Sequence, residues 1–417
     1  RVRSSFFYFR SLFTLTKYTL RVDSNFSKHP VIQLSELAYL YCDGHAKCSL
    51  AKRICVMNSA TLFSKSYSEA RERFLDAAND CGFSIHSQVL DISGPAGEEL
   101  AMDFAVGGPA DAATALVIVS GTHGPEGYTG SACQLGFLTS PEFRELFAHH
   151  RIVLVHAHNP YGFAWTRRTT EGNVDLNRNY VDFNQPLRGN PEYDALHDAF
   201  VPRAIDDPDA KRVLEDYREA HGAVAYMAAM LGGQRTHADG LFYGDTKPAW
   251  SQEVMVAGLR RWLKDQKTVL LIDIHTGLGP YGVPYLVHGY PENDPRFSVL
   301  NTQFGSAMRS TAVKEAFDED LPVDPEGPIV LAMDWILPDK QTYAFVIEYG
   351  TYPPDEVLGA HQQDNWLHAY GDLQSEQGKA IKEELRRVMY PEFDDWKTMI
   401  WNEAEDALYK SAKVLSG

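Results

Sequence analysis

Residues 115–127 have the sequence ALVIVSGTHGPEG. The first six residues are almost all apolar and largely β-branched, which is typical of a short strand buried on both faces. The remaining seven form a Gly- and Pro-rich turn that contains two ionisable side chains, His123 and Glu126. A buried strand that ends in such a turn indicates an α/β sheet with functional groups at the carboxyl end of the strand.

Three further runs of the same kind follow along the chain, at residues 151–156 (RIVLVH), 268–274 (TVLLIDI) and 343–349 (YAFVIEY). Helical patterns at 127–138 and 252–264 lie between them. Strands that alternate with helices are typical of three-layer folds. We therefore expect an α/β protein with a mixed, twisted sheet covered by helices on both faces.

The composition excludes several classes of protein. The chain has 417 residues, with 39 Lys and Arg against 56 Asp and Glu, and a formal net charge of −17. This acidic balance argues against a nucleic-acid partner, because phosphate binding needs clustered basic side chains. No apolar run reaches the roughly 18 residues of a membrane span, and five cysteines do not indicate a disulfide framework. We expect a globular enzyme of the cytoplasm, with no nucleic-acid or membrane partner.

Residues 1–56 differ from the rest of the chain, with nine Lys and Arg and three acidic residues. Such a composition is typical of an organellar transit peptide. The alternative is that this stretch precedes the true start at Met57, and the absence of Met at position 1 favours it. The expected organisation is a non-matching extension at 1–56 and a single catalytic domain at 57–417, with an insertion of helices and loops at about 182–251. Organellar import is expected only if the extension belongs to the natural protein.

Polar side chains follow the predicted strands at the points where the strands end. His123 and Glu126 are three residues apart in the first turn, and His275 follows the third strand. The carboxyl ends of parallel strands meet at one edge of a sheet, so these three side chains are expected to meet. Imidazole and carboxylate ligands suit zinc, and two His with one Glu leave a position open for water. Each residue alone fits a capping or solvated role, but the combination, with Glu348 at the end of the fourth strand, favours a metal site.

A second polar cluster lies between the second and third strands. Arg178 stands between two Asn residues, and its planar guanidinium suits bidentate binding of a carboxylate. Asn177 adds amide donors, and Arg167 or Arg168 upstream would polarise a substrate carbonyl. The alternative interpretation is a solvated loop with a helix cap.

Residues 277–282 (GLGPYG) match the letters of the dinucleotide-binding fingerprint and follow a strand. The fingerprint requires a helix next, whereas residues 283–288 (VPYLVH) have the pattern of another strand. We therefore expect a glycine-rich loop at the active site and no nucleotide site. The sequence has no Gly-x-Ser-x-Gly motif, which disfavours a serine hydrolase.

Taken together, these motifs resemble the zinc carboxypeptidase superfamily, which includes the succinylglutamate desuccinylase and aspartoacylase branch. The superfamily motifs span about 116–350. Within it, THGPEG, RRTTEGNVDLNRN, DIHTGLGPYG, DGLFYGD and NWLHAYG are similar to a little-characterised bacterial and fungal carboxypeptidase-like family, over roughly 57–400. The elements that stand in the superfamily's order are His123-x-x-Glu126, Asn159-Pro160-x-Gly162, Asp175-Leu176-Asn177-Arg178-Asn179, His275 and Glu348.

The resemblance implies a carboxypeptidase-like fold and one zinc ion held by His123, Glu126 and His275. It implies that Glu348 is the general base and acid that works on the zinc-bound water.

The resemblance also implies a substrate clamp at Asn177 and Arg178. The carbonyl-polarising residue is Arg168 or Arg167, and we prefer Arg168 although the loop length leaves both open. The Tyr that covers the substrate in true carboxypeptidases has no clear match. Its candidates are Tyr281, Tyr285 and Tyr290.

The implied activity is zinc-dependent hydrolysis of an amide bond in a peptide end or in a small carboxylate-bearing substrate. One alternative is an N-acyl amino acid deacylase of the aspartoacylase type, and another is a non-catalytic protein that holds a carboxylate ligand at a zinc site. In the insertion, His237, Asp239 and Tyr243 are candidates to line the pocket or are solvated loop residues. Substrate identity and oligomeric state stay open at this point.

Overall fold

The computed structural model describes residues 59–311 and 326–417, and the expected extension at 1–56 lies outside them. The sheet and the helices around it belong to one compact unit that ends at Gly417. Among the described residues, no helix is both long and apolar enough to cross a membrane.

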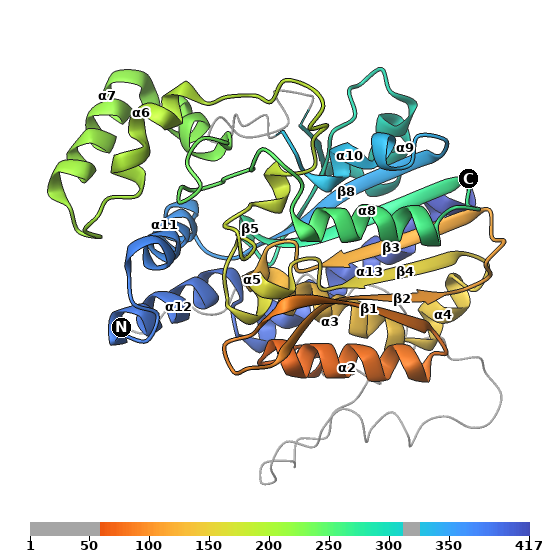
Figure 1. Cartoon of the computed structure of the whole chain (residues 1–417). Helices are drawn as coiled ribbons and strands as arrows, with labels where there is room; N and C mark the ends of the chain where they lie inside the picture. Colours follow the sequence, from red (N-terminus) through yellow and green to blue (C-terminus); the bar gives the residue numbers. More distant parts are fainter. Residues whose placement is uncertain (1–58, 312–325) are drawn as a thin grey trace, which may run out of the picture. The chain divides into compact units, whose positions relative to one another are not determined.

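Eight strands of the described chain form one mixed sheet, in the order β1-β2-β4-β3-β5-β8-β6-β7 (Figure 1). The four central strands, β4, β3, β5 and β8, are parallel. They are the four strands that the apolar runs predict. Antiparallel pairs join β1 to β2, β2 to β4 and β6 to β8. The strands are β1 (Ser84–Ser93), β2 (Glu99–Gly107), β3 (Thr114–Ser120), β4 (Arg151–His156), β5 (Thr268–Tyr281), β6 (Pro284–His288), β7 (Met308–Ser310) and β8 (Gln341–Gly350).

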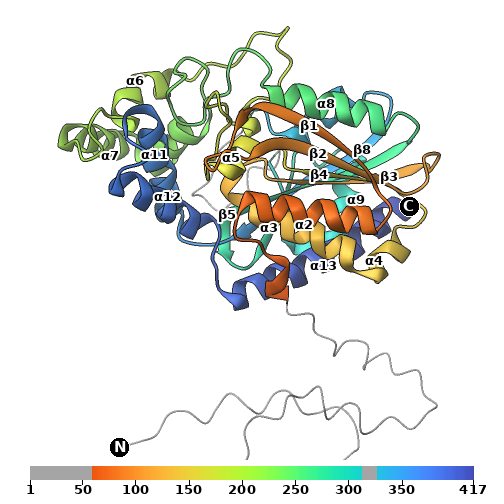
Figure 2. The ribbon, with the colours of Figure 1, turned by 60° about the horizontal axis from the view of Figure 1, so that its bottom comes forward.

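Helices cover both faces of the sheet, which confirms the expected three-layer α/β class. α2, α3 and α13 pack on one face and α8 and α10 on the other (Figures 1 and 2). Each face has its own apolar core, with Phe74 and Trp396 in one and Met255 and Leu259 in the other, all fully buried. The helices are α2 (Tyr67–Asp80), α3 (Gly127–Thr139), α4 (Pro141–Leu146), α5 (Pro160–Ala164), α6 (Pro191–Phe200), α7 (Pro208–Leu231), α8 (Trp250–Trp262), α9 (Pro295–Phe304), α10 (Ile329–Ile336), α11 (Pro354–Tyr370), α12 (Glu376–Met389) and α13 (Asp394–Ser416), with short 3₁₀ turns η2 (Ser59–Leu62), η3 (Gly124–Glu126), η4 (Leu176–Arg178) and η5 (Gly305–Ala307).

Two stretches differ from the sequence-based expectation. The hairpin of β1 and β2 was not predicted, because β1 is a largely exposed edge strand whose polar residues hide the strand pattern. The predicted glycine-rich loop at 277–282 is wrong, because β5 continues to Tyr281. A register shift between Thr276 and Tyr281, with positive φ angles of 116° at Gly277 and 103° at Gly279, bends the strand without ending it.

The turn between β3 and α3 is packed so closely that it requires glycine at position 124. The Gly124 N–H donates to the carbonyl oxygen of Arg167 at 3.1 Å. A Cβ atom at this position would lie 1.9 Å from the carbonyl carbon of Gly162 and 2.4 Å from the Arg167 oxygen. These neighbours are backbone atoms, which move only if the loop moves. The turn that carries His123 and Glu126 is therefore held directly against the loop that carries the arginines.

We expect Gly124→Ala to lower the free energy of unfolding by about 1–3 kcal/mol, the usual cost of forcing an extra methyl group into a packed site. Gly359→Ala in α11 is the matched control, because its Cβ would meet no atom within 4 Å. Helix propensity alone favours Ala there by up to about 1 kcal/mol. Urea unfolding of the two variants measures the difference, and equal stabilities would contradict the close packing.

Candidate active site

Three buried side chains from separate segments converge on one point. His123 follows β3, Glu126 ends η3, and His275 lies within β5, and each is at most 2% exposed. The Nδ1 atom of His123 lies 2.9 Å from Glu126 Oε1, and the Nδ1 atom of His275 lies 2.8 Å from Glu126 Oε2. The two Nδ1 atoms are 3.1 Å apart. Two imidazole nitrogens and a carboxylate gathered in this way form a set of ligands that suits a divalent transition metal.

A chain of hydrogen bonds behind His275 fixes the orientation of its ring. Thr122 Oγ1 donates to Asp273 Oδ1 at 2.7 Å, so it accepts from His158 Nδ1 at 2.9 Å. His158 Nε2 then accepts from the hydroxyl of Tyr180 at 2.5 Å. The other carboxylate oxygen of Asp273 lies 2.8 Å from His275 Nε2. This carboxylate favours the proton on Nε2 and leaves the Nδ1 lone pair directed toward Glu126, as a metal ligand requires.

The electrostatics of the three residues are strongly coupled. Burial raises the pKa of Glu126, but the imidazoles of His123 and His275 outweigh burial and hold that pKa well below its usual range. Burial lowers the pKa of His275, but Asp273 and Glu126 outweigh burial and raise that pKa well above its ordinary value. A carboxylate of this kind keeps its charge only beside a cation, which is either protonated imidazole or a metal ion.

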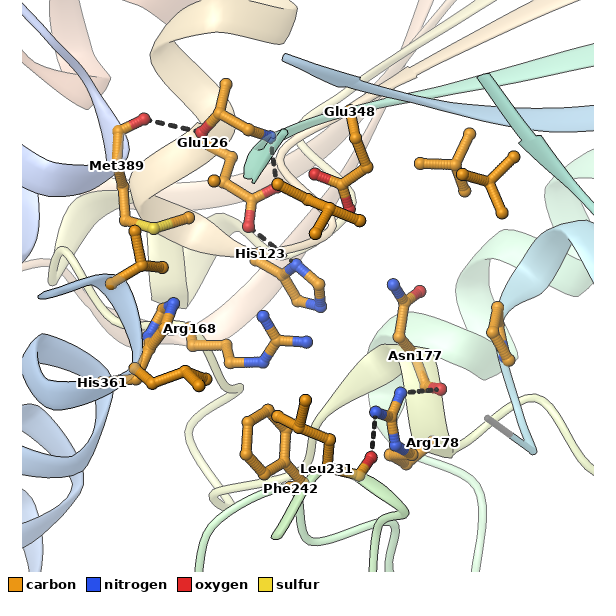
Figure 3. Close-up of a pocket in the computed structure, with 18 of the residues that line it drawn as sticks. His123, Glu126, Arg168, Asn177, Arg178, Leu231, Phe242, Glu348, His361 and Met389 are labelled. Carbon is orange, nitrogen blue, oxygen red and sulfur yellow. Dashed lines mark hydrogen bonds and ion pairs between the residues drawn. The ribbon is translucent and has the colours of Figure 1, made fainter. Parts of the chain in front are cut away.

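Glu348 faces the same cavity from the neighbouring strand. In the β5–β8 pairing its Cα lies opposite that of His275. Its Oε2 atom is buried and has no hydrogen-bond partner. Burial, together with the nearby Glu126 carboxylate, raises the pKa of Glu348 to about 8. Figure 3 shows this carboxylate beside Glu126 and above His123, at one end of a cavity of about 240 Å³.

The arginine beside the candidate metal ligands is Arg168. Its Nε donates to Asp175 Oδ2 at 2.9 Å, and the other oxygen of Asp175 lies 3.3 Å from His123 Nε2. Asp175 thus holds both a candidate ligand and an arginine of the cavity wall. The guanidinium of Arg168 also lies 5.1 Å from the ring centre of Phe242, within the range of a cation–π contact.

Asn177 and Arg178 line the opposite side of the cavity (Figure 3). The guanidinium of Arg178 donates to the carbonyl oxygens of Asn177 at 2.9 Å and Leu231 at 2.6 Å. Its Nε and the Oδ1 atom of Asn177 are buried without a partner. These two polar atoms are available for hydrogen bonds to a ligand, on a wall that is otherwise mostly apolar.

Arg167 does not line the cavity. Its guanidinium donates to Asn173 Oδ1 at 2.6 Å, and burial lowers its pKa. The structure therefore brings Arg168, and not Arg167, to the group of His123, Glu126 and His275. The insertion residues His237, Asp239 and Tyr243 also lie off the cavity wall, and so do the candidate covering residues Tyr281, Tyr285 and Tyr290.

Sequence reasoning missed several residues of the site. His361 of α11 lines the cavity, is 5% exposed, and has a buried Nδ1 atom without a partner. Burial lowers its pKa to about 3, so its imidazole is neutral. A single His in an amphipathic helix carries no signal of this position. Asp175 and Asp273 lay inside quoted motifs, but only the coordinates show what their carboxylates contact.

Residues 63–403 match a family whose description is "Protein of unknown function (DUF2817)". The chain belongs to this family. No protein of curated function matches the DUF2817 chain in sequence.

Solved structures that resemble the DUF2817 chain include carboxypeptidase A from Helicoverpa armigera, at 12% identity and a TM-score of 0.39, over 77% of this chain and 73% of that one. A metallo-carboxypeptidase from Pseudomonas aeruginosa covers 83% of this chain and 68% of its own, at 14% identity and a TM-score of 0.37. Bovine thrombin-activatable fibrinolysis inhibitor covers 85% and 97%, at 15% identity and a TM-score of 0.39. The first two are named as carboxypeptidases.

We expect Thr122→Val to lower the free energy of unfolding of the metal-free protein by about 1–3 kcal/mol, because it removes the hydroxyl that donates to the buried Oδ1 atom of Asp273. Thr129→Val is the matched control, since the Thr129 hydroxyl is buried and has no partner. Unfolding in urea with EDTA present compares the two. A stability loss of the same size in both variants would mean that the Thr122 hydrogen bonds do not support the site.

Proposed function

We propose that this protein is a zinc-dependent hydrolase that cleaves an amide bond in a peptide end or in a small substrate bearing a carboxylate. The observation that carries the proposal is the convergence of His123, Glu126 and His275 beside Glu348, at the end of a cavity that also presents two guanidinium groups. Each of these parts has a separate role in hydrolysis.

The donor set fits one zinc ion. His123 and His275 offer Nδ1 atoms, Glu126 offers its carboxylate, and three protein ligands leave one position open. When bound, zinc acts as a Lewis acid on a carbonyl oxygen and brings the pKa of water towards about 7. The second carboxylate, Asp273, orients His275 from behind.

Glu348 is the proton carrier in this proposal. Its unpartnered carboxylate oxygen faces the cavity, so it is free to take a proton from water and deliver it to the leaving nitrogen. A pKa of Glu348 near neutrality lets its carboxyl group both accept a proton from water and donate one to the leaving nitrogen. A protein that only bound a carboxylate ligand would have no use for an ionisable group at this place, which disfavours the non-catalytic alternative.

The two arginines divide the work of recognising the substrate. Arg168 lies on the same wall as His123 and is held by Asp175, so it is placed to stabilise negative charge on the carbonyl oxygen. Arg178 and Asn177 lie farther along the cavity and bind the substrate carboxylate.

The cavity favours small substrates. A volume of about 240 Å³ accommodates a small molecule or the last residue of a peptide, and an N-acyl amino acid fits the same space. Deacylation of an N-acyl amino acid is therefore the second candidate function, and it uses the same residues. A screen of N-acyl amino acids against short peptides, with zinc-loaded protein, distinguishes the two.

We expect Glu348→Gln to keep the zinc content of the unaltered protein and to lower turnover by at least about 10²-fold, because the amide does not accept the proton. Elemental analysis measures the zinc, and hydrolysis of the best substrate of the screen measures turnover. Glu376→Gln, on the exposed first turn of α12, is the control and should retain full activity. Unchanged turnover in Glu348→Gln would remove Glu348 from the mechanism.

We expect Arg168→Ala and Asn177→Ala to differ in kinetics. Loss of Arg168 should lower kcat by about 10²–10³-fold, since its charge acts mainly in the transition state. Loss of Asn177 should raise KM with little change in kcat, since it binds substrate and transition state alike. Arg203→Ala, an exposed guanidinium, is the control. If Arg168→Ala and Asn177→Ala changed kcat and KM in the same way, the separate roles of the two residues would be contradicted.

A further inference from the structure

A second group of His and Asp side chains, which are of the types that bind metals, lies in the insertion, away from the cavity. Asp194 and His197 are three residues apart on α6 and share one face of that helix. His237 and Asp239 come from the loop after α7. In Figure 1, α6, α7 and α11 lie together on the left, beyond the ends of the strands. His197, His237 and Asp239 offer ligand atoms that all lie within 4.8 Å of one another.

The distances in this group fit ligands that share an ion better than they fit hydrogen bonds. His197 Nε2 lies 3.4 Å from Asp239 Oδ1, and His237 Nε2 lies 3.3 Å from Asp194 Oδ1. His237 Nε2 and His197 Nδ1 are buried and make no hydrogen bond. Two ligands of a tetrahedral zinc ion, each bonded at about 2.1 Å, are separated by about 3.4 Å. The unpartnered Nε2 of His237 and the Nε2 of His197 thus each lie near a carboxylate oxygen at the spacing of two ligands that share an ion.

The loop that carries His237 and Asp239 is held in place by its own contacts. The Gln234 side chain accepts from the His237 N–H at 2.8 Å and donates to the His237 carbonyl oxygen at 2.7 Å. The Tyr370 hydroxyl donates to Asp239 Oδ2 at 2.9 Å, which leaves Oδ1 directed at His197. Such outer contacts orient metal ligands in known sites.

We propose that His197, His237 and Asp239 bind a second zinc ion, and that Asp194, which lies 3.3 Å from His237 Nε2 but outside that group of three, turns toward the ion as the fourth ligand. Two imidazoles and two carboxylates suit zinc, and four protein ligands leave no open position, which is typical of a structural site. The imidazole rings are stacked, with centroids 3.8 Å apart and planes at 14°. Binding therefore rotates a ring about its Cβ–Cγ bond so that both lone pairs meet the ion.

An ion bound at this site would connect α6 to Phe242, a residue of the cavity wall. Phe242 follows the metal-binding loop directly and contacts both Arg168 and Arg178 across the cavity. An ion that ties Asp239 to His197 limits movement of the loop and thus of Phe242. The site rests on its own residues and does not depend on the proposed hydrolase function.

Zinc stoichiometry tests the proposal. The full chain is saturated with zinc, passed through chelating resin, and analysed for zinc and protein. We expect two zinc ions per chain in the unaltered protein, one in His197→Ala/His237→Ala, and one in His275→Ala. His221→Ala, an exposed His of the same insertion, is the matched control and should keep two.

The His275→Ala variant separates this site from the active site. One zinc ion retained there, and lost when His197→Ala/His237→Ala is added, supports the proposal. No zinc in His275→Ala, or an unchanged content in His197→Ala/His237→Ala, overturns it. Should the double variant fail to fold by circular dichroism, Asp239→Asn replaces it, since the amide still accepts from Tyr370. Its affinity for the second zinc should fall at least about tenfold, measured by chelator competition, and an unchanged affinity also overturns the proposal.

Discussion

The carboxylate of Glu126 lies between two imidazoles and is almost fully buried. A buried carboxylate without a partner is costly, and the cost is removed only by cations held at short distance. The rings of His123, just after β3, and His275, within β5, lie against this carboxylate because the sheet fixes the carboxyl ends of these two adjacent parallel strands side by side. The rest of the site depends on this contact, because the turn, the arginine loop and β8 all pack around it.

The sheet supplies the rigidity that such a site needs. Asp273 is two residues before His275 in β5, so both side chains point to the same face of the strand. Asp273 is fully buried, and its hydrogen bonds lead through Thr122 to residues of two other segments. A ring held in this way has one direction. The candidate ligands are therefore oriented before any ion arrives, which reduces the free-energy cost of binding one.

The sequence was sufficient to predict the central strands and the convergence of His123, Glu126 and His275, and the reason is physical. Strands apolar on both faces belong to the middle of a covered sheet, and the ends of parallel strands meet, so His123 and His275 were expected to be neighbours. The edge strand β1 gave no such signal, because one of its faces is exposed. The choice between Arg167 and Arg168 depends on a single residue of register in an irregular loop. The periodicity of a sequence does not show which residue of a loop faces a site. Here the close contact of Gly124 with the backbone of the arginine loop fixes that alignment.

The chemical and the apolar parts of the cavity come from different parts of the fold. His275 and Glu348 lie on neighbouring central strands, whereas the apolar wall includes Met227 and Leu231 of α7, which belongs to the insertion. α7 is mostly exposed and has its own small core with α6, separate from the two cores of the sheet. Substitutions in α7 change the shape of the cavity without disturbing the strands that carry His275 and Glu348. Phe242 is the point at which the two parts meet, since its ring contacts both cavity arginines. The fold therefore lets the shape of the cavity change through the insertion while the group at the strand ends stays the same, which is why the strands and their ends indicate the chemistry that we propose and do not indicate the substrate.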